Sequence, residues 1–196
     1  VRNVIKAPSC VVENKHISCF ELLTDEERKI VDDNKVDIKY KKGEIIAKQG
    51  SFASHVIFLQ EGLVKVYLEG NPKDLIIKII PDSHLITLSS IYEGNTTFLY
   101  SAAAYLESTA SLIDADIFKQ LIRTNSLFAA KIINILNENT AQVYGRFYCL
   151  TRKQSHGRVA DILLCLSQRV YKSDRFNLAL SRNDLADLTG LSTESV

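Results

Sequence analysis

The sequence predicts an α+β protein in which a strand-rich N-terminal half precedes a helical C-terminal half. From Val36 to Ile113, short apolar runs alternate with glycine-containing turns, a pattern typical of a β sandwich or barrel. From about Asp116 onward, apolar residues recur at helical spacing. The last part of the chain, from Ser181 to Val196, has the pattern of two short helices joined by a tight turn.

The composition is that of a globular protein with one large core or two small ones. The chain has 196 residues, of which 46% are hydrophobic, and a formal net charge of +1. No apolar run reaches the length of a membrane span, and the N-terminus lacks the apolar segment of a secretory signal. We therefore expect a cytoplasmic protein with no membrane partner. Residues 146–196 carry 8 basic and 5 acidic side chains, which fits phosphate contact and an ordinary solvated helix surface equally well.

The first predicted helix begins at Thr24, and Glu27 three residues later completes a capping box. Val36, Ile38 and Tyr40 then alternate with polar residues, which predicts a half-buried strand. Further strands are predicted from the apolar runs that follow, at 44–48, 55–60, 63–68, 75–80, 97–106 and 109–113.

A long helix is predicted after the strands, because apolar residues between Ala129 and Leu150 recur at alternating spacings of three and four. Such a stripe packs either on its own β domain or on a second copy of the chain. Its length favours the second copy, since it exceeds the face that so small a domain can cover. The residues predicted to form the dimer seam are Ile132, Leu136, Val143, Phe147 and Leu150.

After a break at 152–157, we expect an amphipathic helix over 159–170 and a short strand over 176–180. Ser181 can cap the next helix, with Asp184 as its acidic partner in the first turn. Gly190 makes the turn, and Ser192 can cap a second helix that begins at Thr193. We expect this second helix to continue beyond Val196, so that the motif is incomplete here.

Three motifs, in this order, resemble those of the Crp/Fnr superfamily of bacterial transcription regulators. The segments KGEII (42–46), QG (49–50) and LQEGLVKV (59–66) are similar to the glycine framework of the family's cyclic-nucleotide-binding-type β roll. The segment GRVA (157–160) is similar to the element that opens its DNA-binding domain, and residues 181–196 are similar to its helix-turn-helix.

The resemblance implies a fold of three parts. Residues 1–115 would form a sensor domain, a double-stranded β-helix or jelly-roll-like β roll, and residues 116–153 a long dimerisation helix. Residues 154–196 would form a winged helix-turn-helix, incomplete at its end. The resemblance also implies a homodimer that reads a pseudo-palindromic site in double-stranded DNA. RNA polymerase and a small-molecule effector are candidate further partners.

Four residues are candidates for DNA contact by the same resemblance. Arg182 and Ser192 match phosphate-contacting positions, and Glu194 matches a base-reading glutamate of the second helix. A carboxylate suits that role because it accepts a hydrogen bond from cytosine N4 in the major groove. Thr193 occupies a neighbouring position that contacts bases in many members. The alternatives are capping alone for Ser192 and stabilisation by the helix dipole for Glu194.

The residues that bind cyclic AMP in this family are missing. Cyclic-AMP-binding members hold the phosphate and ribose with a Gly-Glu pair and an Arg-Ser pair. Here the stretch 82–90 contains no glycine or glutamate, and the Arg-Ser position is Tyr100-Ser101, so we expect no cyclic AMP. What remains is either a filled core or a largely apolar effector pocket. The candidate pocket residues are Leu85, Leu88, Ser89, Ile91, Tyr92, Tyr100 and Ser101.

Metal and haem sites are not expected either. An iron–sulfur cluster needs converging thiolates, but no cysteine lies between Cys19 and Cys149, and Cys10 is the only other one near the N-terminus. His55 and His84 are isolated, which argues against haem and against an enzyme on a metal-binding barrel. We therefore predict no cofactor, no metal site and no catalytic residue. The alternative to a regulator is an effector-binding module that acts through protein contacts without specific DNA binding.

Overall fold

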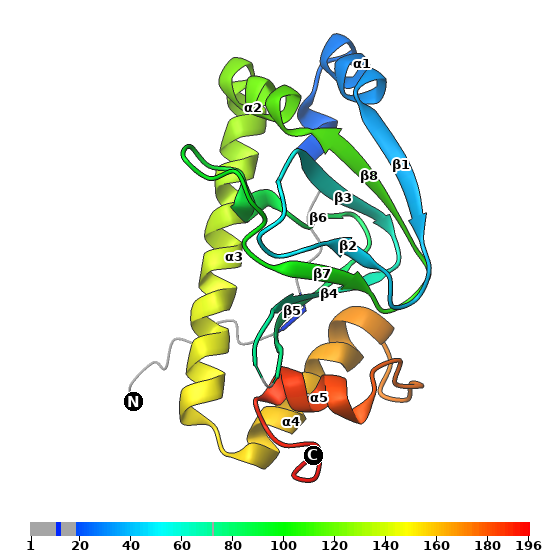
Figure 1. Ribbon diagram of the computed structural model, residues 1–196, viewed down its shortest axis with the longest axis vertical. Helices are drawn as coiled ribbons and strands as arrows, with labels where there is room; N and C mark the ends of the chain where they lie inside the picture. The colour runs from blue at the N-terminus through cyan, green and yellow to red at the C-terminus, as the bar shows by residue number, and fades with distance from the viewer. Residues whose placement is uncertain (1–10, 13–18, 72) are drawn as a thin grey trace.

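Two four-stranded antiparallel sheets form the N-terminal half of the chain (Figure 1). The computed structural model describes residues 11–12, 19–71 and 73–196. The strand orders are β1-β8-β3-β6 and β2-β7-β4-β5, which confirms the predicted jelly-roll-like β roll. The strands are β1 (Lys35–Tyr40), β2 (Ile45–Ala47), β3 (His55–Glu61), β4 (Leu63–Leu68), β5 (Leu75–Pro81), β6 (His84–Leu85), β7 (Ser101–Ala104) and β8 (Ser108–Asp114).

Side chains that alternate along the strands are buried on both faces of the β roll. On β3, Ile57 and Leu59 lie in the core between the sheets, whereas Val56 packs with the helices on the other face. On β4, Val64 and Val66 enter the intersheet core and are fully buried. The β roll therefore has a core of its own and, outside it, an apolar face on which helices pack.

The strands follow the apolar runs with two differences. The run 97–106 forms only β7, Ser101–Ala104, and the apolar pattern does not predict β6, His84–Leu85, because two residues show no alternation. The turn between β3 and β4 requires glycine for two reasons. Gly62 has a φ of +117°, and a Cβ at this position would lie 2.6 Å from the Cβ of Ser108.

Helix α1 (Asp25–Asp33) begins with the predicted capping box, which is confirmed. The hydroxyl of Thr24 accepts a hydrogen bond from the backbone N–H of Glu27 at 3.2 Å. The carboxylate of Glu27 accepts one from the backbone N–H of Thr24 at 2.9 Å. These two bonds satisfy backbone donors that a helix start otherwise leaves without partners.

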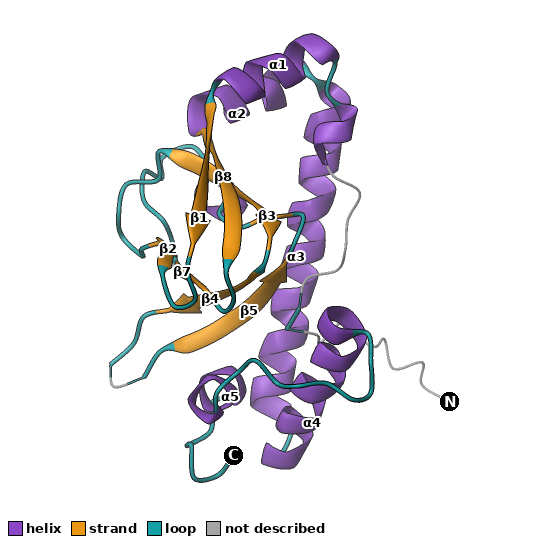
Figure 2. Ribbon diagram, turned by 90° about the vertical axis from the view of Figure 1, so that its right-hand side faces the viewer, coloured by secondary structure: helices purple, strands orange, loops and turns teal. Residues whose placement is uncertain are grey.

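The prediction of one long helix over 116–153 is wrong, because two helices occupy that range. Helix α2 is Ala115–Thr124, and helix α3 is Ser126–Arg152. Figure 2 shows α3 running along the side of the β roll. Although α3 has 27 residues, no helix in the described part of the chain combines the length and apolar character needed to cross a membrane.

The break between α2 and α3 lies at Asn125, whose backbone is extended. Its side-chain oxygen accepts a hydrogen bond from the backbone N–H of Phe128 at 2.9 Å and so caps α3. Its side-chain nitrogen donates to the carbonyl of Leu22 at 3.1 Å and to the carboxylate of Glu27 at 2.8 Å. The break is therefore held by residues about a hundred positions earlier, which a local periodic pattern cannot reveal.

The C-terminal part contains helix α4 (Ser155–Leu166), a π-helical turn η3 (Ser167–Tyr171) and helix α5 (Arg182–Thr189). The break before α4 is shorter than predicted and comprises only residues 153–154. The helix predicted over 159–170 is confirmed as a helical segment, but it begins earlier, and its last residues adopt π geometry.

The strand predicted over 176–180 does not form. The backbone N–H of Ala179 donates to the hydroxyl of Tyr171 at 2.9 Å instead of to another strand. The ring of Phe176 stacks on that of Tyr171, with their centroids 4.4 Å apart. The Tyr171 side chain thus provides the hydrogen-bond acceptor that a neighbouring strand would otherwise supply.

Candidate nucleic-acid interface and effector cavity

Helix α5 and the turn after it match the first helix and the turn of the predicted helix-turn-helix. The hydroxyl of Ser181 accepts from the backbone N–H of Asp184 at 3.1 Å, and the Asp184 carboxylate accepts from the backbone N–H of Ser181 at 2.9 Å. The predicted capping box is therefore confirmed. Gly190 ends α5 with a φ of +64°, in the left-handed region that favours glycine.

The second helix predicted to begin at Thr193 is not assigned among residues 191–196. The hydroxyl of Ser192 accepts from the backbone N–H of Ser195 at 3.1 Å, which confirms the capping contact predicted for Ser192. The carbonyl of Ser192 accepts from the backbone N–H of Val196, also at 3.1 Å. Residues 193–195 are otherwise a turn, not an assigned helix.

The four predicted DNA-contact residues lie at the two ends of this motif. Arg182 begins α5, and Arg182, Ser192 and Glu194 are exposed. Thr193 is half-buried, and its hydroxyl donates to the side-chain oxygen of Asn183 at 3.0 Å, which ties the turn to the start of α5. The backbone N–H of Glu194 and the hydroxyl of Ser192 lower the pKa of the Glu194 carboxyl, so it is ionised at neutral pH.

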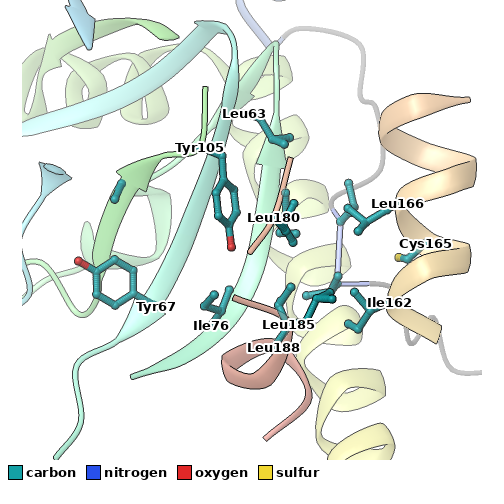
Figure 3. Packing of buried hydrophobic residues seen from close by; sticks show 14 residues of the cluster. Leu63, Tyr67, Ile76, Tyr105, Ile162, Cys165, Leu166, Leu180, Leu185 and Leu188 are labelled. Carbon is teal, nitrogen blue, oxygen red and sulfur yellow. The ribbon is translucent and has the colours of Figure 1, made fainter. Parts of the chain in front are cut away.

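The helix-turn-helix packs directly on the outer face of the sheet β2-β7-β4-β5. Figure 3 shows Leu63, Ile76 and Tyr105 of the β roll facing the α4–α5 side chains, which include Leu185 and Leu188. All five are buried, with exposed fractions of 7% or less. The β roll and the helices α4 and α5 of one chain therefore share a hydrophobic core, which we call the interdomain core.

Lys65 reinforces the interdomain core with a polar contact that the sequence did not indicate. Its Nζ lies 3.1 Å from Oδ1 of Asp184 and 5.5 Å from the ring centroids of Tyr67 and Tyr105. Burial acts to raise the pKa of Asp184, but hydrogen bonds from Ser181 and Lys65 outweigh it, so the pKa lies below its usual value. Asp184 therefore both completes the capping box of α5 and pairs with Lys65 of the β roll.

The predicted dimer seam divides into a buried part and an exposed part. Ile132 is only 3% exposed and lies in a core formed with the β roll, so its assignment to a dimer seam is wrong. Leu136 packs partly on the same core. Val143 and Phe147 are 57% and 69% exposed, and Leu150 is half-buried. The alternative of a helix packed on its own domain therefore holds for the N-terminal half of α3.

Two exposed tyrosines extend the apolar surface beyond the predicted residues. Tyr144 is 68% exposed and Tyr148 is 56% exposed. Together with Val143 and Phe147 they form what we call the α3 aromatic patch. The spacing of apolar residues missed the tyrosines, because their positions lie beside the predicted stripe, one residue after Val143 and Phe147. A large exposed apolar surface of this kind is typical of an interaction site.

The predicted effector-pocket residues do not form one pocket. Leu85 and Leu88 are buried in the core that contains α2 and α3, and Ile91 packs at the edge of that core. Tyr92 is 54% exposed. These four residues therefore do not share a pocket with Tyr100, because apolar packing and solvent exposure place them elsewhere.

Polar contacts fix the other three predicted residues. The hydroxyl of Tyr100 donates to the carbonyl of Ile86 at 2.7 Å and lies 2.9 Å from the hydroxyl of Ser89. Ser101 is fully buried, and its hydroxyl donates to the carboxylate of Glu69. The Ser101 hydroxyl and the Tyr100 hydroxyl thus have different partners and different surroundings.

Ser89 and Tyr100 line a cavity of about 200 Å³ between the β roll and α3. The β roll also contributes Lys78 of β5, and α3 contributes Val143 and Arg146. The sequence pattern did not indicate Arg146, because an arginine in a helix ordinarily faces water. The cavity therefore connects the β roll with the same segment of α3 that carries the aromatic patch.

The thiols of the described residues are not arranged as metal ligands. Among the residues that the structure describes, no group of three or more histidine, cysteine, aspartate or glutamate side chains can hold a metal ion. Burial raises the pKa of the Cys19 thiol to about 12. The thiol of Cys149 donates to Asp161 at 3.5 Å. Cys10 lies outside the described residues, so the absence of an iron–sulfur cluster or haem stays a prediction.

Known proteins are similar to this chain in both sequence and fold. The cyclic nucleotide-binding domain family matches residues 37–125. The transcriptional activator protein FnrA of Stutzerimonas stutzeri is 26% identical over 165 residues, which are 80% of this chain and 65% of FnrA. FixK2 from Bradyrhizobium japonicum superposes with a TM-score of 0.73 at 21% identity, over 82% of this chain and 80% of FixK2. A protein of Eubacterium rectale described as a Crp/Fnr family regulator has a TM-score of 0.73 at 17% identity, over 91% and 82% of the two chains.

The chain contains a cyclic nucleotide-binding domain and resembles Crp/Fnr regulators in sequence and fold. The matched cyclic nucleotide-binding domain begins within β1 and ends directly after α2, so it coincides with the β roll and its first helix. The chain spans less than two thirds of the length of FnrA. Its β roll, α3 and helix-turn-helix occur in the order that the sequence motifs predict.

Proposed function

We propose that this chain is a homodimeric transcription regulator, not an enzyme, that reads a pseudo-palindromic site in double-stranded DNA. The observation that carries the proposal is the exposed turn at Ser192–Glu194, held against the start of α5 by the bond between Thr193 and Asn183. FnrA, with which the chain shares 26% identity, is named a transcriptional activator. RNA polymerase is the further partner that this function implies.

The geometry of the turn suits recognition of a base pair. In a helix-turn-helix, the first helix crosses the DNA backbone and the N-terminal residues of the second reach base edges in the major groove. Glu194 lies in the first turn of the predicted second helix, and its ionised carboxylate accepts hydrogen bonds, as contact with cytosine N4 requires. Arg182, exposed at the start of α5, has the charge and position for a phosphate contact.

The α3 aromatic patch supports the homodimer. Val143, Tyr144, Phe147 and Tyr148 are each more than half exposed over two successive helical turns. Two copies packed along this segment would bury the patch around a two-fold axis. The axis would then place two helix-turn-helix motifs on successive major grooves, about 34 Å apart.

The effector of such a regulator would differ from cyclic AMP. The family's phosphate-binding pair corresponds to Tyr100 and Ser101, and the Ser101 hydroxyl already donates to the Glu69 carboxylate. A second anion at this hydroxyl would meet the charge of Glu69, which also pairs with Lys48 at 2.6 Å. The charge of Glu69 beside the buried Ser101 hydroxyl therefore disfavours a phosphate at this position.

DNA recognition can be tested without knowledge of the operator. Duplexes would first be selected from a randomised library with the purified protein, and binding of the selected duplex would then be measured by fluorescence anisotropy. We expect Arg182→Ala to weaken all duplexes by a similar factor. Glu194→Ala should instead remove about 1–3 kcal/mol of discrimination at one base pair of each half-site. Glu93→Ala, at an exposed carboxylate of the β roll, is the matched control and should change neither.

Two results would contradict the proposal. One is that selection enriches no sequence, which would favour an effector-binding module that acts through protein contacts. The other is that Arg182→Ala and Glu194→Ala bind the selected duplex as tightly and as selectively as Glu93→Ala does. Enrichment of a sequence without two-fold symmetry would retain DNA recognition and reject the homodimeric arrangement.

A further inference from the structure

The first residues that the structure describes, Val11 and Val12, lie inside the interdomain core. Their exposed fractions are 2% and 0%. The buried cluster to which they belong also contains Ile76 of β5, Ile162 of α4 and Leu185 of α5. These two residues, which we call the N-terminal segment, therefore lie where the β roll meets the helices that follow α3.

The backbone of the N-terminal segment pairs with the edge of β5. Strand β5 is the last strand of its sheet, so one of its edges has no neighbouring strand within that sheet. At this edge the backbone N–H of Ile79 donates to the carbonyl of Val11 at 2.9 Å, and Val12 forms an isolated parallel bridge with Ile79 (Figure 1). An edge strand binds an extended segment in this way because its outer backbone groups otherwise lack partners.

The next carbonyl of the N-terminal segment binds the helical part of the chain. Nη1 of Arg169, in the π-helical turn η3 directly after α4, donates to the carbonyl of Val12 at 2.6 Å. Successive residues of an extended chain face opposite sides, so Val11 can bond to β5 while Val12 bonds to η3. The bond from Arg169 is charge-assisted and therefore stronger than a neutral hydrogen bond.

We propose that the edge of β5 and Arg169 form a strand-addition site whose occupant is the chain's own N-terminal segment, and that this segment holds α4 and α5 on the β roll. Its two valines supply apolar side chains to the contact, and its two carbonyls bond to the two parts that meet there. The intersheet core of the β roll contains neither valine. Release of the segment should therefore loosen the helices and leave the β roll folded.

The N-terminal segment thereby affects where the helix-turn-helix lies relative to α3. In the proposed homodimer, that position sets the spacing of the two motifs on DNA. A motif that moves freely must be ordered again when DNA binds, which costs conformational entropy and lowers affinity. This consequence for DNA binding rests on the proposed function, whereas the attachment of α4 and α5 to the β roll does not.

Hydrogen exchange of the full chain tests the attachment. Arg169→Met removes the hydrogen bond to the Val12 carbonyl and keeps an unbranched side chain. We expect the amides of Ile79 and of α5 to exchange about tenfold faster or more, because local opening of these parts becomes easier. The amides of β8, which belongs to the other sheet, should exchange at an unchanged rate.

A second variant and a matched control complete the experiment. Val12→Asp buries a carboxylate among apolar side chains, so it should accelerate the same amides more than Arg169→Met does. Arg28→Met is the control. The guanidinium of Arg28 also donates to a backbone carbonyl, that of Glu21 at 3.0 Å, but Arg28 belongs to α1. Its loss should leave exchange at Ile79 and in α5 unchanged.

Three results would overturn the proposal. The first is unchanged exchange in α5 for both Arg169→Met and Val12→Asp. The second is acceleration at Ile79 alone, since the N-terminal segment would then complete the sheet edge without holding the helices. The third is acceleration of β8 in Arg169→Met by the same factor as α5, which would indicate a general loss of stability.

Fluorescence anisotropy with the selected duplex tests the consequence for DNA binding. Arg169→Met and Val12→Asp should both bind about tenfold more weakly with an unchanged base preference, whereas Arg28→Met should bind as the unmodified protein does. Weaker binding by Arg169→Met alone would indicate loss of a cation and reject control by the segment. Faster exchange with unchanged affinity would reject it as well. An unmodified protein that binds no duplex would reject the proposed function and leave the exchange result valid.

Discussion

The two halves of α3 have the same apolar spacing but opposite surroundings. In the N-terminal half, Phe128, Ile132 and Ile135 are buried against the β roll, with exposed fractions of 0%, 3% and 8%. In the C-terminal half, Phe147 is 69% exposed, whereas its neighbour Arg146 is 6% exposed. One helix therefore presents its apolar side to its own domain at one end and to the outside at the other.

The difference shows that apolar spacing predicts a buried face without predicting what buries it. The N-terminal half of α3 is covered by α2 and β3, so its apolar side chains contribute to the fold of a single chain. The C-terminal half runs beyond this core, where polar groups line the cavity and apolar groups face outward. The proposed dimer surface therefore lies in the half of α3 that this core does not cover.

The largest expected effect comes from the covered half. Phe128 is fully buried and packs edge-to-face with Phe118, with their ring centroids 5.3 Å apart. We expect Phe128→Ala to lower the free energy of unfolding by about 3–5 kcal/mol, measured by urea denaturation. Its neighbour Leu127 is 67% exposed, and Leu127→Ala should cost less than about 0.5 kcal/mol. Similar losses for the two variants would remove the distinction between the faces of this half.

The next effect tests the uncovered half. We expect Phe147→Glu to leave the folding of one chain intact and to weaken the proposed dimer by at least about 2 kcal/mol, because it places a charge in the α3 aromatic patch. Sedimentation velocity over a concentration series measures the change. Leu127→Glu introduces the same charge at an equally exposed position of the N-terminal end and should leave the dimer unchanged. Equal dimerisation of both variants would mean that the patch is not the interface.

A smaller effect concerns the point where the covered half begins. Asn125→Ala removes the cap of α3 together with the hydrogen bonds to Leu22 and Glu27. We expect a loss of about 1–2 kcal/mol in the free energy of unfolding, observed by chemical denaturation. Thr140→Ala is the control, since the Thr140 hydroxyl donates to the carbonyl of Leu136 within the same helix. If both variants lose the same amount, the contacts of Asn125 with the first helix contribute nothing.

The smallest effect concerns the helices that follow the uncovered half. Because the folded-state pKa of Asp184 lies below its usual value of 3.8, its ionised form stabilises the protein above about pH 4. That stabilisation is lost as the pH falls through the folded-state pKa. Lys65→Met should therefore make stability less dependent on pH below about 4, by no more than about 1 kcal/mol, in urea unfolding at a series of pH values. Lys119→Met, which removes the exposed ion pair with Asp116, is the control and should keep the original pH dependence of stability. If Lys65→Met also keeps that pH dependence, the Lys65–Asp184 contact does not stabilise the protein.

Local chemistry explains which elements the sequence predicts well. The capping boxes at Thr24 and Ser181 and the turn at Gly190 depend on residues within four positions of one another, and all three are confirmed. The strands of the β roll follow from alternation, since neighbouring side chains point to opposite faces. The order of the three sequence motifs predicts the resemblance to the Crp/Fnr family, and the comparisons support this resemblance.

The predictions from sequence are wrong where contacts with a distant segment determine the local structure. Asn125 breaks the long helix because its side chain reaches Leu22 and Glu27. The segment 176–180 forms no strand, because the Tyr171 hydroxyl takes the backbone N–H of Ala179. Three of the seven predicted effector residues fail for the same reason, since Leu85, Leu88 and Ile91 pack in the core that α2 and α3 complete.

By itself the sequence determined the β roll, the helical C-terminal half and the capped turn that carries Glu194, because spacing and capping are local properties of the chain. Only the tertiary structure decided that Ile132 is buried, that Phe147 is exposed and that Arg146 faces a cavity without a charged partner in the described part of the chain. These three residues lie on one helix, and their surroundings depend on which strands and helices pack beside them. The physical reason is that burial is a property of the assembled fold, whereas helical periodicity is a property of the segment.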